Sequence, residues 1–161
     1  MKIHFITTGG TIDKVYFDAR SKYEVGDSQI PEMLRDSNAT IEYAVMNVLQ
    51  KDSLELTVED RAVLRQAIES SDEQHFVVTH GTDTMIDTAK ALGGIPGKVV
   101  VLTGSLSPAR FKSSDAVFNV GTAVAAVQCL PEGVYIVMNG RIFSPDRVRK
   151  NREANRFEEV P

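Results

Sequence analysis

The chain has 161 residues, of which 42% are hydrophobic and 25% are charged, a balance typical of one globular domain with a sizeable core. The formal net charge of -4 argues against a nucleic-acid-binding protein, because such a protein needs a concentrated basic face. No apolar run approaches the ~20 residues of a membrane span, so neither nucleic acid nor a membrane is expected as a partner. Cys129 is the only cysteine, and the apolar run before Thr7 is too short for a secretory signal, so we expect a cytoplasmic location.

The first third of the chain begins with an apolar segment, residues 1–6, which we predict as a strand. Residues 13–26 are polar and lack a sustained helical period, and they are predicted as a loop or small hairpin flap with Tyr23 near its end. A short helix is predicted over residues 30–35, and a second strand over residues 41–46.

The middle of the chain alternates helix and strand. Thr57 is expected to cap a helix whose positive N-terminal end suits Asp60. Residues 76–79 are predicted as the third strand, and residues 84–92 as a helix that ends at the glycine pair 93–94. The helix after Thr57 places four side chains on one face: Val63, Leu64, Ala67 and Ile68.

The last third contains the clearest strand, residues 98–103, which is apolar almost throughout, as expected for a parallel strand covered on both faces. A helix is predicted over residues 114–128, and the fifth strand over residues 134–138. The alternation predicts an α/β fold: a Rossmann-like, mainly parallel sheet with helices on both faces, formed by residues 1–161 as a single domain.

Two strands end in polar turns that carry threonines. The first strand leads into Thr7-Thr8-Gly9-Gly10-Thr11, which lacks the spacing of a phosphate-binding loop. The adjacent glycines allow a sharp turn and close approach to a ligand, although an ordinary strand-to-loop turn explains the same residues. Because parallel sheets place their chemistry just past the carboxyl ends of strands, this turn is a candidate nucleophile site.

The second turn, His80-Gly81-Thr82-Asp83, follows the third strand. Free helix amides near Thr82 and Asp83 would hold a substrate carboxylate or an oxyanion, while simple helix capping by either residue is the alternative. His80 is placed at a strand end, which favours a structural hydrogen-bonding role over that of a base.

A threonine hydroxyl is a weak nucleophile unless a neighbour takes its proton, and a lysine with reduced hydration can do this. Lys150 is a candidate, but it lies within a basic tail, residues 147–156, whose other basic residues favour a solvated or subunit-facing surface. Tyr23 could relay a proton or could simply pack. No His, Cys and carboxylate group has metal-ligand spacing, so neither a metal nor a cofactor is expected.

Together these segments resemble the bacterial-type L-asparaginases, which are amidohydrolases with a threonine nucleophile. Thr8-Gly9-Gly10-Thr11-Ile12 is similar to the first family signature, and His80-Gly81-Thr82-Asp83-Thr84-Met85 to the second. Weaker similarity continues over residues 52–53, 102–105, 114–119 and 137–139, so the resemblance covers nearly the whole chain.

The resemblance implies a role for each matched residue. Thr11 matches the nucleophile, Tyr23 the flap tyrosine that hydrogen-bonds it, and Thr82 the second catalytic threonine. Asp83 matches the carboxylate that holds the substrate's α-ammonium, and Lys150 the lysine that tunes Thr82. The implied substrate-binding residues are Gly10, Asp52, Ser53, Thr82 and Asp83, with Ser53 near the α-carboxylate and with the flap over about residues 13–27.

The resemblance also implies an activity: two-step acyl transfer that converts L-asparagine to L-aspartate and ammonia. L-Glutamine is a candidate second substrate, because one extra methylene changes binding by only about 1–3 kcal/mol. The family has a C-terminal domain that this chain, ending at Pro161, is expected to lack. A homo-oligomer, with a dimer favoured, would then cover the site. The alternative is a catalytically weak asparagine- or aspartate-binding module, or a subunit of a larger amidotransferase-like assembly.

Overall fold

Apolar, largely β-branched segments form a six-stranded sheet at the centre of the described residues. The computed structural model describes residues 1–17 and 22–161, and the side chains of residues 16, 17, 22 and 23 lie outside that description. The sheet has the strand order β4-β1-β5-β6-β7-β8, in which only β8 pairs in the antiparallel sense. Its strands are β1 (Lys2–Gly9), β4 (Glu42–Lys51), β5 (His75–Thr79), β6 (Val99–Thr103), β7 (Gly133–Met138) and β8 (Arg141–Phe143).

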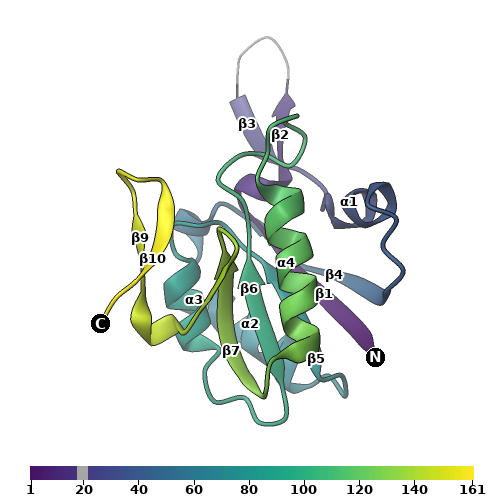
Figure 1. Cartoon of the computed structure of the whole chain (residues 1–161), viewed down its shortest axis with the longest axis vertical. Coiled ribbons are helices and arrows are strands. Elements are labelled where there is room, and N and C mark those ends of the chain that lie inside the picture. The colour runs from purple at the N-terminus through teal and green to yellow at the C-terminus, as the bar shows by residue number, and fades with distance from the viewer. Residues whose placement is uncertain (18–21) are drawn as a thin grey trace.

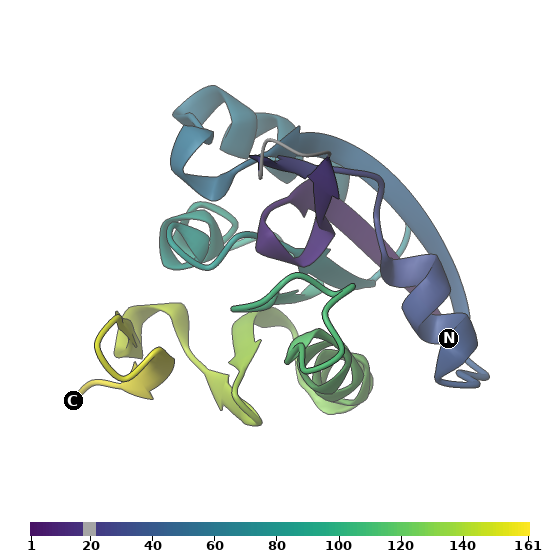
Figure 2. The same ribbon diagram turned by 90° about the horizontal axis from the view of Figure 1, so that it is seen from above.

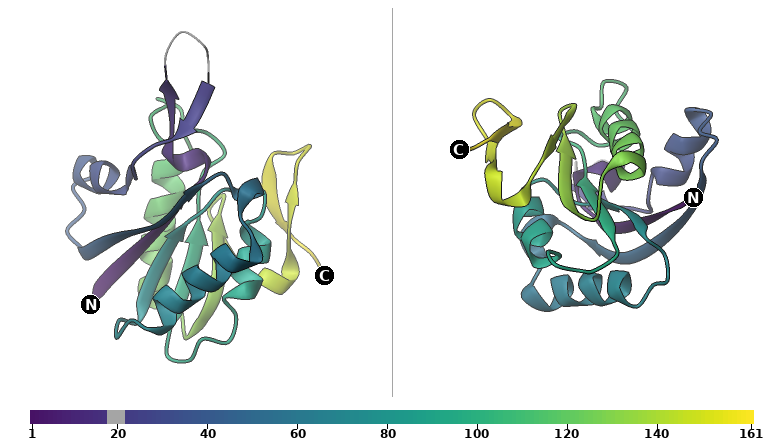
Figure 3. Two further views of the ribbon diagram at one scale, coloured as in Figure 1. Left: turned by 180° about the vertical axis from the view of Figure 1, so that it is seen from behind. Right: turned by 60° about the horizontal axis from the view of Figure 1, so that its bottom comes forward.

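Helices cover both faces of this sheet. On one face, α2 (Val58–Glu69) and α3 (Met85–Ala91) pack onto β1, β5, β6 and β7 through one hydrophobic cluster. On the other face, α1 (Ile30–Asp36) and α4 (Ala116–Cys129) form a second cluster with the same sheet. Figure 1 shows α4 in front of the sheet, Figure 2 shows the layers from above, and the left view of Figure 3 shows α2 on the opposite side.

Local sequence explains the best-defined elements. All five residues of β6 are buried, which suits an apolar strand between two helical layers. At the start of α2, the Thr57 hydroxyl accepts the Asp60 N–H and the Asp60 carboxylate accepts the Thr57 N–H, so two helix-end amides are satisfied reciprocally. No described helix is both long enough and apolar enough to cross a lipid bilayer.

Two small antiparallel hairpins project from the sheet. The first joins β2 (Lys14–Phe17) to β3 (Lys22–Val25) directly after the one-turn helix η1 (Thr11–Asp13), and it stands at the top of Figure 1. The second joins β9 (Val148–Asn151) to β10 (Arg156–Glu159) and lies beside α3. Both hairpins are therefore separate from the six-stranded sheet.

The sequence predictions of the main elements are confirmed. All five predicted strands are present, although β4 continues to Lys51, five residues past its predicted end. The helices predicted over residues 30–35, 84–92 and 114–128 correspond to α1, α3 and α4. Within the segment predicted as a loop or small hairpin, residues 14–17 and 22–25 pair as an antiparallel hairpin, which is one of the two alternatives.

One prediction about these elements is wrong. Val63 is predicted on the buried face of α2 with Leu64 and Ile68, but it is 50% exposed because only the stripe through those two residues faces the sheet. In the basic tail, four of the five basic residues are exposed, as predicted for most of them, but β8 and the β9–β10 hairpin after β7 were not predicted from the sequence. Asn139 and Gly140 between β7 and β8 both have positive φ, at 54° and 74°, and Asn-Gly is a hairpin-turn signal in the sequence itself.

The contrast between Leu64 and Val63 gives a stability test. Leu64→Ala is expected to lower the free energy of unfolding by about 2–5 kcal/mol, because Leu64 is 1% exposed and the deletion leaves a cavity. Val63→Ala, one residue away on the exposed side of α2, is expected to stay within about 0.5 kcal/mol of the parent. Urea titrations of the three proteins measure this difference, and equal losses would contradict the assigned helix orientation.

Candidate active site

Three threonines stand in register at the carboxyl ends of neighbouring parallel strands. Thr7 on β1 pairs with Thr79 on β5, and Thr79 pairs with Thr103 on β6. The Thr8 hydroxyl also donates to the Thr79 carbonyl at 2.9 Å, which fastens the end of β1 to β5. The loops that follow these strands therefore leave the sheet at one edge, where α/β proteins usually bind ligands.

The loops after β1 and β5 touch through two glycines. Gly10 has a φ of 90°, which favours glycine, and a Cβ added to it would overlap the backbone nitrogen of Gly81. Thr11 directly follows Gly10, and Thr82 directly follows Gly81. The glycine contact therefore brings the two threonine-bearing turns together, as their positions after parallel strands predicted.

A third segment, residues 51–53, packs against the same two turns. The Gly10 N–H donates to the Lys51 carbonyl at 3.0 Å, and a Cβ added to Gly81 would lie 2.5 Å from the Ser53 hydroxyl oxygen. Ser53 is only 2% exposed, and its carbonyl accepts the Thr84 hydroxyl at 2.7 Å. Ser53 thus reaches the candidate site as predicted, between the loop after β4 and the loop after β5.

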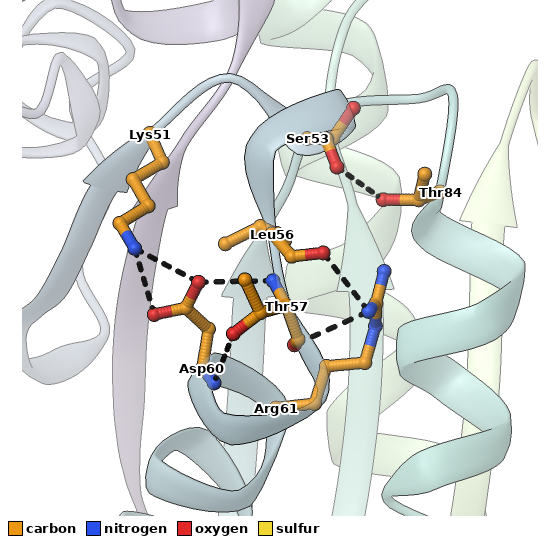
Figure 4. Close-up of polar contacts among 7 residues, drawn as sticks. All are labelled: Lys51, Ser53, Leu56, Thr57, Asp60, Arg61 and Thr84. Carbon is orange, nitrogen blue, oxygen red and sulfur yellow. Dashed lines mark hydrogen bonds and ion pairs between the residues drawn. The ribbon is translucent and has the colours of Figure 1, made fainter.

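Polar contacts hold residues 51–57 in place (Figure 4). Lys51 Nζ lies 2.9 Å from both carboxylate oxygens of Asp60, the residue that completes the cap of α2. Arg61 Nη1 donates to the carbonyls of Leu56 and Thr57 at 3.1 and 3.2 Å. The segment that carries Ser53 is therefore fastened to the first turn of α2, so its backbone is fixed by local structure.

Lys150 approaches Thr82 and Asp83 from β9, far away in the sequence. Its Nζ donates to Thr82 Oγ1 and to Asp83 Oδ1, both at 2.8 Å, and the Lys150 side chain is 15% exposed. Arg152 Nη2 lies 3.5 Å from the same Asp83 oxygen, and the Arg152 side chain is 74% exposed. A hydroxyl, an ammonium and a carboxylate are thus in direct contact, which is an arrangement suited to proton transfer.

The β9–β10 hairpin positions Lys150 because its base is buried. Lys150 pairs with Phe157 on β10, and Phe157 is 2% exposed in the core cluster beside α3. The Phe157 N–H also donates to the Asn139 side chain at 2.9 Å, which links the hairpin to the turn after β7. The solvated alternative for the basic tail is therefore wrong for Lys150, whereas it holds for the exposed Arg149 side chain.

His80 has the structural role that its place at a strand end predicted. It is fully buried, its Nδ1 lies 2.7 Å from the Gly81 carbonyl, and its Nε2 lies 2.8 Å from the Thr88 hydroxyl. Burial lowers the pKa of His80 to about 4, so the ring is neutral at physiological pH. It therefore links the turn to α3 and holds no charge for catalysis.

Asp13 is a buried carboxyl within the segment predicted as a polar flap. It is 1% exposed at the end of η1, where its Oδ1 accepts the Gln29 N–H at 2.9 Å. Burial raises the pKa of Asp13 to about 6, although the Gln29 hydrogen bond lowers it in part. Nothing in the polar stretch around it signals this burial, because it comes from packing between the hairpin base and α1.

The remaining predicted site residues have mixed outcomes. Asp52 lies beside Ser53, but its carboxylate contacts Lys14 Nζ at 2.8 Å and the Leu54 N–H at 3.1 Å. Helix capping by Thr82 or Asp83 is wrong, because Thr84 is the N-cap of α3. The side chain of Tyr23 lies outside the described residues, so its role stays a prediction. Within the described residues, no group of three His, Cys, Asp or Glu side chains has a geometry that could hold a metal ion.

Comparison with known proteins gives consistent matches. Residues 2–159 match the family model described as Asparaginase, N-terminal. The L-asparaginase of Thermococcus kodakarensis is 33% identical over 158 residues, which cover 93% of this chain and 48% of that protein. A subunit of the glutamyl-tRNA(Gln) amidotransferase of Methanococcus vannielii is 32% identical over 154 residues, which cover 87% of this chain and 34% of that protein.

The fold matches as well as the sequence. The solved structure of the thermostable L-asparaginase from Thermococcus kodakarensis aligns with a TM-score of 0.87 and 27% identity, over 99% of this chain and 51% of that one. This likeness confirms the α/β class with its mostly parallel sheet. The chain spans about half the length of the L-asparaginases it matches.

The buried Asp13 carboxyl predicts a pH-dependent difference in stability. Its pKa is 3.8 in ordinary surroundings and about 6 in the fold, so the folded state binds the proton more tightly and stability falls as pH rises through this window. An Asp13→Asn variant should therefore gain stability relative to the parent between about pH 4 and pH 6, by roughly 3 kcal/mol. Urea titrations of both proteins at each pH measure the gain.

The comparison isolates Asp13 because other groups titrate in both proteins. His80 contributes the opposite slope: its pKa falls from 6.5 to about 4 on folding, so its stabilising effect is lost as pH falls through that range. That slope is common to the two proteins and cancels in the difference. A difference in stability that does not change with pH would disprove the raised pKa of Asp13.

Proposed function

Because this chain belongs to the asparaginase N-terminal family, we propose that it is an amidohydrolase that converts L-asparagine to L-aspartate and ammonia. The observation that carries the proposal is the contact of Lys150 Nζ with Thr82 Oγ1 and Asp83 Oδ1, both at 2.8 Å. This contact unites residues from distant parts of the chain at the edge of the sheet where ligands bind. A purely structural edge would have no need of a lysine, a threonine and an aspartate in direct contact.

The proposed reaction is a two-step acyl transfer through Thr11. The Thr11 hydroxyl oxygen forms a bond to the side-chain amide carbon of asparagine, a proton passes to the departing nitrogen, and ammonia leaves an ester on the enzyme. Water then cleaves this ester, releases aspartate and restores the hydroxyl. Tyr23, on the β2–β3 hairpin that begins just after Thr11, is proposed to hydrogen-bond the nucleophile.

Thr82, Lys150 and Asp83 are proposed to transfer the proton that the nucleophile gives up. Thr82, held by Lys150 at 2.8 Å, is proposed to relay the proton that the attacking hydroxyl or water gives up: its own hydroxyl proton passes to Lys150 in the unprotonated form, and the reverse transfer delivers a proton to the leaving group. Lys150 takes part through its place in the hydrogen bond, and Asp83 fixes the lysine from the other side at 2.8 Å. Backbone N–H groups in the glycine-containing turns would stabilise the oxyanion, worth roughly 3 kcal/mol per donor.

Charged groups would orient the substrate. The Asp83 side chain is 32% exposed, and its carboxylate is proposed to hold the substrate's α-ammonium through a charge-assisted hydrogen bond. Ser53 and the turn around Gly10 are proposed to face the α-carboxylate. L-Glutamine is proposed as a second substrate, because one added methylene changes binding by only about 1–3 kcal/mol.

The proposed active form is a homodimer in the cytoplasm. Asp83 and Arg152 leave one side of the site open to solvent, and a symmetric partner is the commonest way to cover such a surface. The cytoplasmic part of the proposal rests on Cys129, the lone and exposed cysteine, which a reducing compartment keeps free.

A second candidate function is supported by one specific comparison. The match to the amidotransferase component from Methanococcus vannielii covers 87% of this chain, so the domain could instead serve as the amidase part of a larger assembly, or as an amino-acid-binding module with weak catalysis. Ammonia release from asparagine or glutamine by the purified protein separates these candidates. Calorimetric binding of asparagine without any turnover would favour the second.

Removal of either threonine hydroxyl tests the mechanism. Thr11→Ala and Thr82→Ala are each expected to lower kcat for ammonia release from asparagine by roughly 10³-fold or more, because residues that act as a unit fail together. Thr122→Ala is the control, since this hydroxyl donates to the Phe118 carbonyl on the outer part of α4. Retained turnover in a well-folded Thr11→Ala protein would count directly against Thr11 as the nucleophile.

Lys150 and its neighbour on β9 provide a second matched pair. Lys150→Met is expected to lower kcat by roughly 100-fold or more, as for loss of a group in general acid–base catalysis. Arg149→Met removes a cation one residue away that pairs with Glu158 at 3.1 Å and faces away from Thr82, so it should leave kcat within about two-fold. Steady-state kinetics with asparagine measure both values of kcat. Similar losses of kcat in the two variants would show that any lost positive charge on β9 lowers activity, and that Lys150 has no specific role.

A further inference from the structure

The β2–β3 hairpin is pinned at its base to the segment that carries Ser53. Lys14, the first residue of β2, follows η1 directly, and its Nζ lies 2.8 Å from Asp52 Oδ2. The Lys14 side chain is 25% exposed and the Asp52 side chain 33%. This ion pair therefore joins two segments that approach the candidate active site from different parts of the sequence.

A second contact holds β3, the other strand of the hairpin, at the position opposite Lys14. Val25 is the partner of Lys14 in the hairpin register, and the Gln50 side-chain amide donates to the Val25 carbonyl at 2.7 Å. Gln50 and Asp52 both belong to the end of β4 and the turn after it. Both strands of the hairpin base are thus held by the segment that leads into Ser53.

Asp52 is the link between the hairpin and the one-turn helix η2 (Ser53–Glu55). One carboxylate oxygen meets Lys14, while the other accepts the Leu54 N–H at 3.1 Å and caps η2. The hydrogen bond from Lys14 is the main reason that the pKa of Asp52 lies below its usual value, so the carboxylate is charged when the pair forms. Displacement of Lys14 would remove one of the two contacts that hold the Asp52 carboxylate beside Ser53.

Lys14 lies outside the proposed catalytic centre. It lines a surface hollow of about 630 Å³ with Glu24, Gln50, Lys51, Asp52 and Glu55, and neither Thr11, Ser53 nor Thr82 lines this hollow. The charged groups that face the pair are therefore Lys51, Glu24 and Glu55. An effect of Lys14 on the substrate must pass through Asp52 and the hairpin.

We propose that Lys14 is a positioning residue that clamps the base of the β2–β3 hairpin to Asp52, so that the hairpin and the Ser53 segment are prearranged before the substrate binds. This inference rests on the proposed amidohydrolase function and assigns a role within it to a residue outside the reacting groups. Preorganisation of this kind lowers the cost of ordering on binding, so its loss raises KM more than it lowers kcat.

The experiment compares Lys14→Met, Lys14→Arg and the parent protein. Lys14→Met should raise KM for asparagine by roughly two- to five-fold, the range expected for a partly exposed ion pair, and leave kcat within about 1.5-fold. Lys14→Arg keeps the charge and should restore most of the affinity. Arg141→Met, which breaks the Arg141–Glu159 pair at 3.2 Å on β8 and β10, is the control for loss of a surface ion pair.

Two further measurements show whether Lys14 acts through Asp52. In an Asp52→Asn background, Lys14→Met should add no further rise in KM, because the partner is already gone. Hydrogen exchange should be roughly two- to five-fold faster at the amides of residues 14–17 and 22–25 in Lys14→Met, and unchanged in Lys14→Arg and Arg141→Met. Unchanged KM and exchange in Lys14→Met, or a full added effect in the Asp52→Asn background, would overturn the clamp.

The design separates failure of the clamp from failure of the proposed function. If the parent protein releases no ammonia from asparagine or glutamine, the amidohydrolase proposal fails, and the exchange data alone decide the clamp. Faster exchange confined to Lys14→Met then supports the clamp, and equal exchange in all variants rejects it. If the parent is active, KM and exchange must change together.

Discussion

The candidate site depends on a backbone contact that side chains would prevent. Gly10 meets the backbone of Gly81, and Gly81 in turn meets Ser53, at distances that leave no space for a Cβ. Two loops can therefore touch through their main chains, and the third places the Ser53 side chain directly against the Gly81 backbone. Because these loops are also fixed by the strands before them, the threonines that follow the two glycines start from a rigid backbone, as a catalytic centre requires.

The charges around these loops are arranged in pairs that differ in exposure. Asp83 Oδ1 contacts both Lys150 and Arg152, and Asp52 pairs with Lys14, so each of these two carboxylates has at least one cation beside it. The buried groups follow the other rule: His80 stays neutral, and burial favours the neutral form of Asp13. Charge is therefore available at the solvent-facing side of the site, where the proposed zwitterionic substrate would enter, whereas the buried His80 carries no charge at physiological pH.

The layered core could be predicted from the sequence because local pattern and tertiary packing agree there. The apolar run of β6 and the capping residues of α2 carry their own signals, and the confirmed α/β class follows from their alternation. The exposure of Val63 could not be predicted, because a short amphipathic helix does not reveal which edge of its apolar stripe meets the sheet. The burial of Asp13 arises from α1 and the hairpin base, which no local pattern describes.

The candidate-site residues that could be predicted from the sequence are those that lie next to strand ends. Gly10 and Ser53 both lie against Gly81, the residue directly before Thr82 and Asp83, at the sheet edge that follows β1 and β5. Lys150 is different, because composition and charge could not separate it from its basic neighbours. Its position comes from Phe157, whose buried side chain fixes the opposite strand of the hairpin, and from Asn139 in the turn between β7 and β8, whose side chain accepts the Phe157 N–H. Lys150 is thus distinguished from its basic neighbours by Phe157 and Asn139, which fix the hairpin that carries it. Neither of these two residues belongs to the proposed catalytic group.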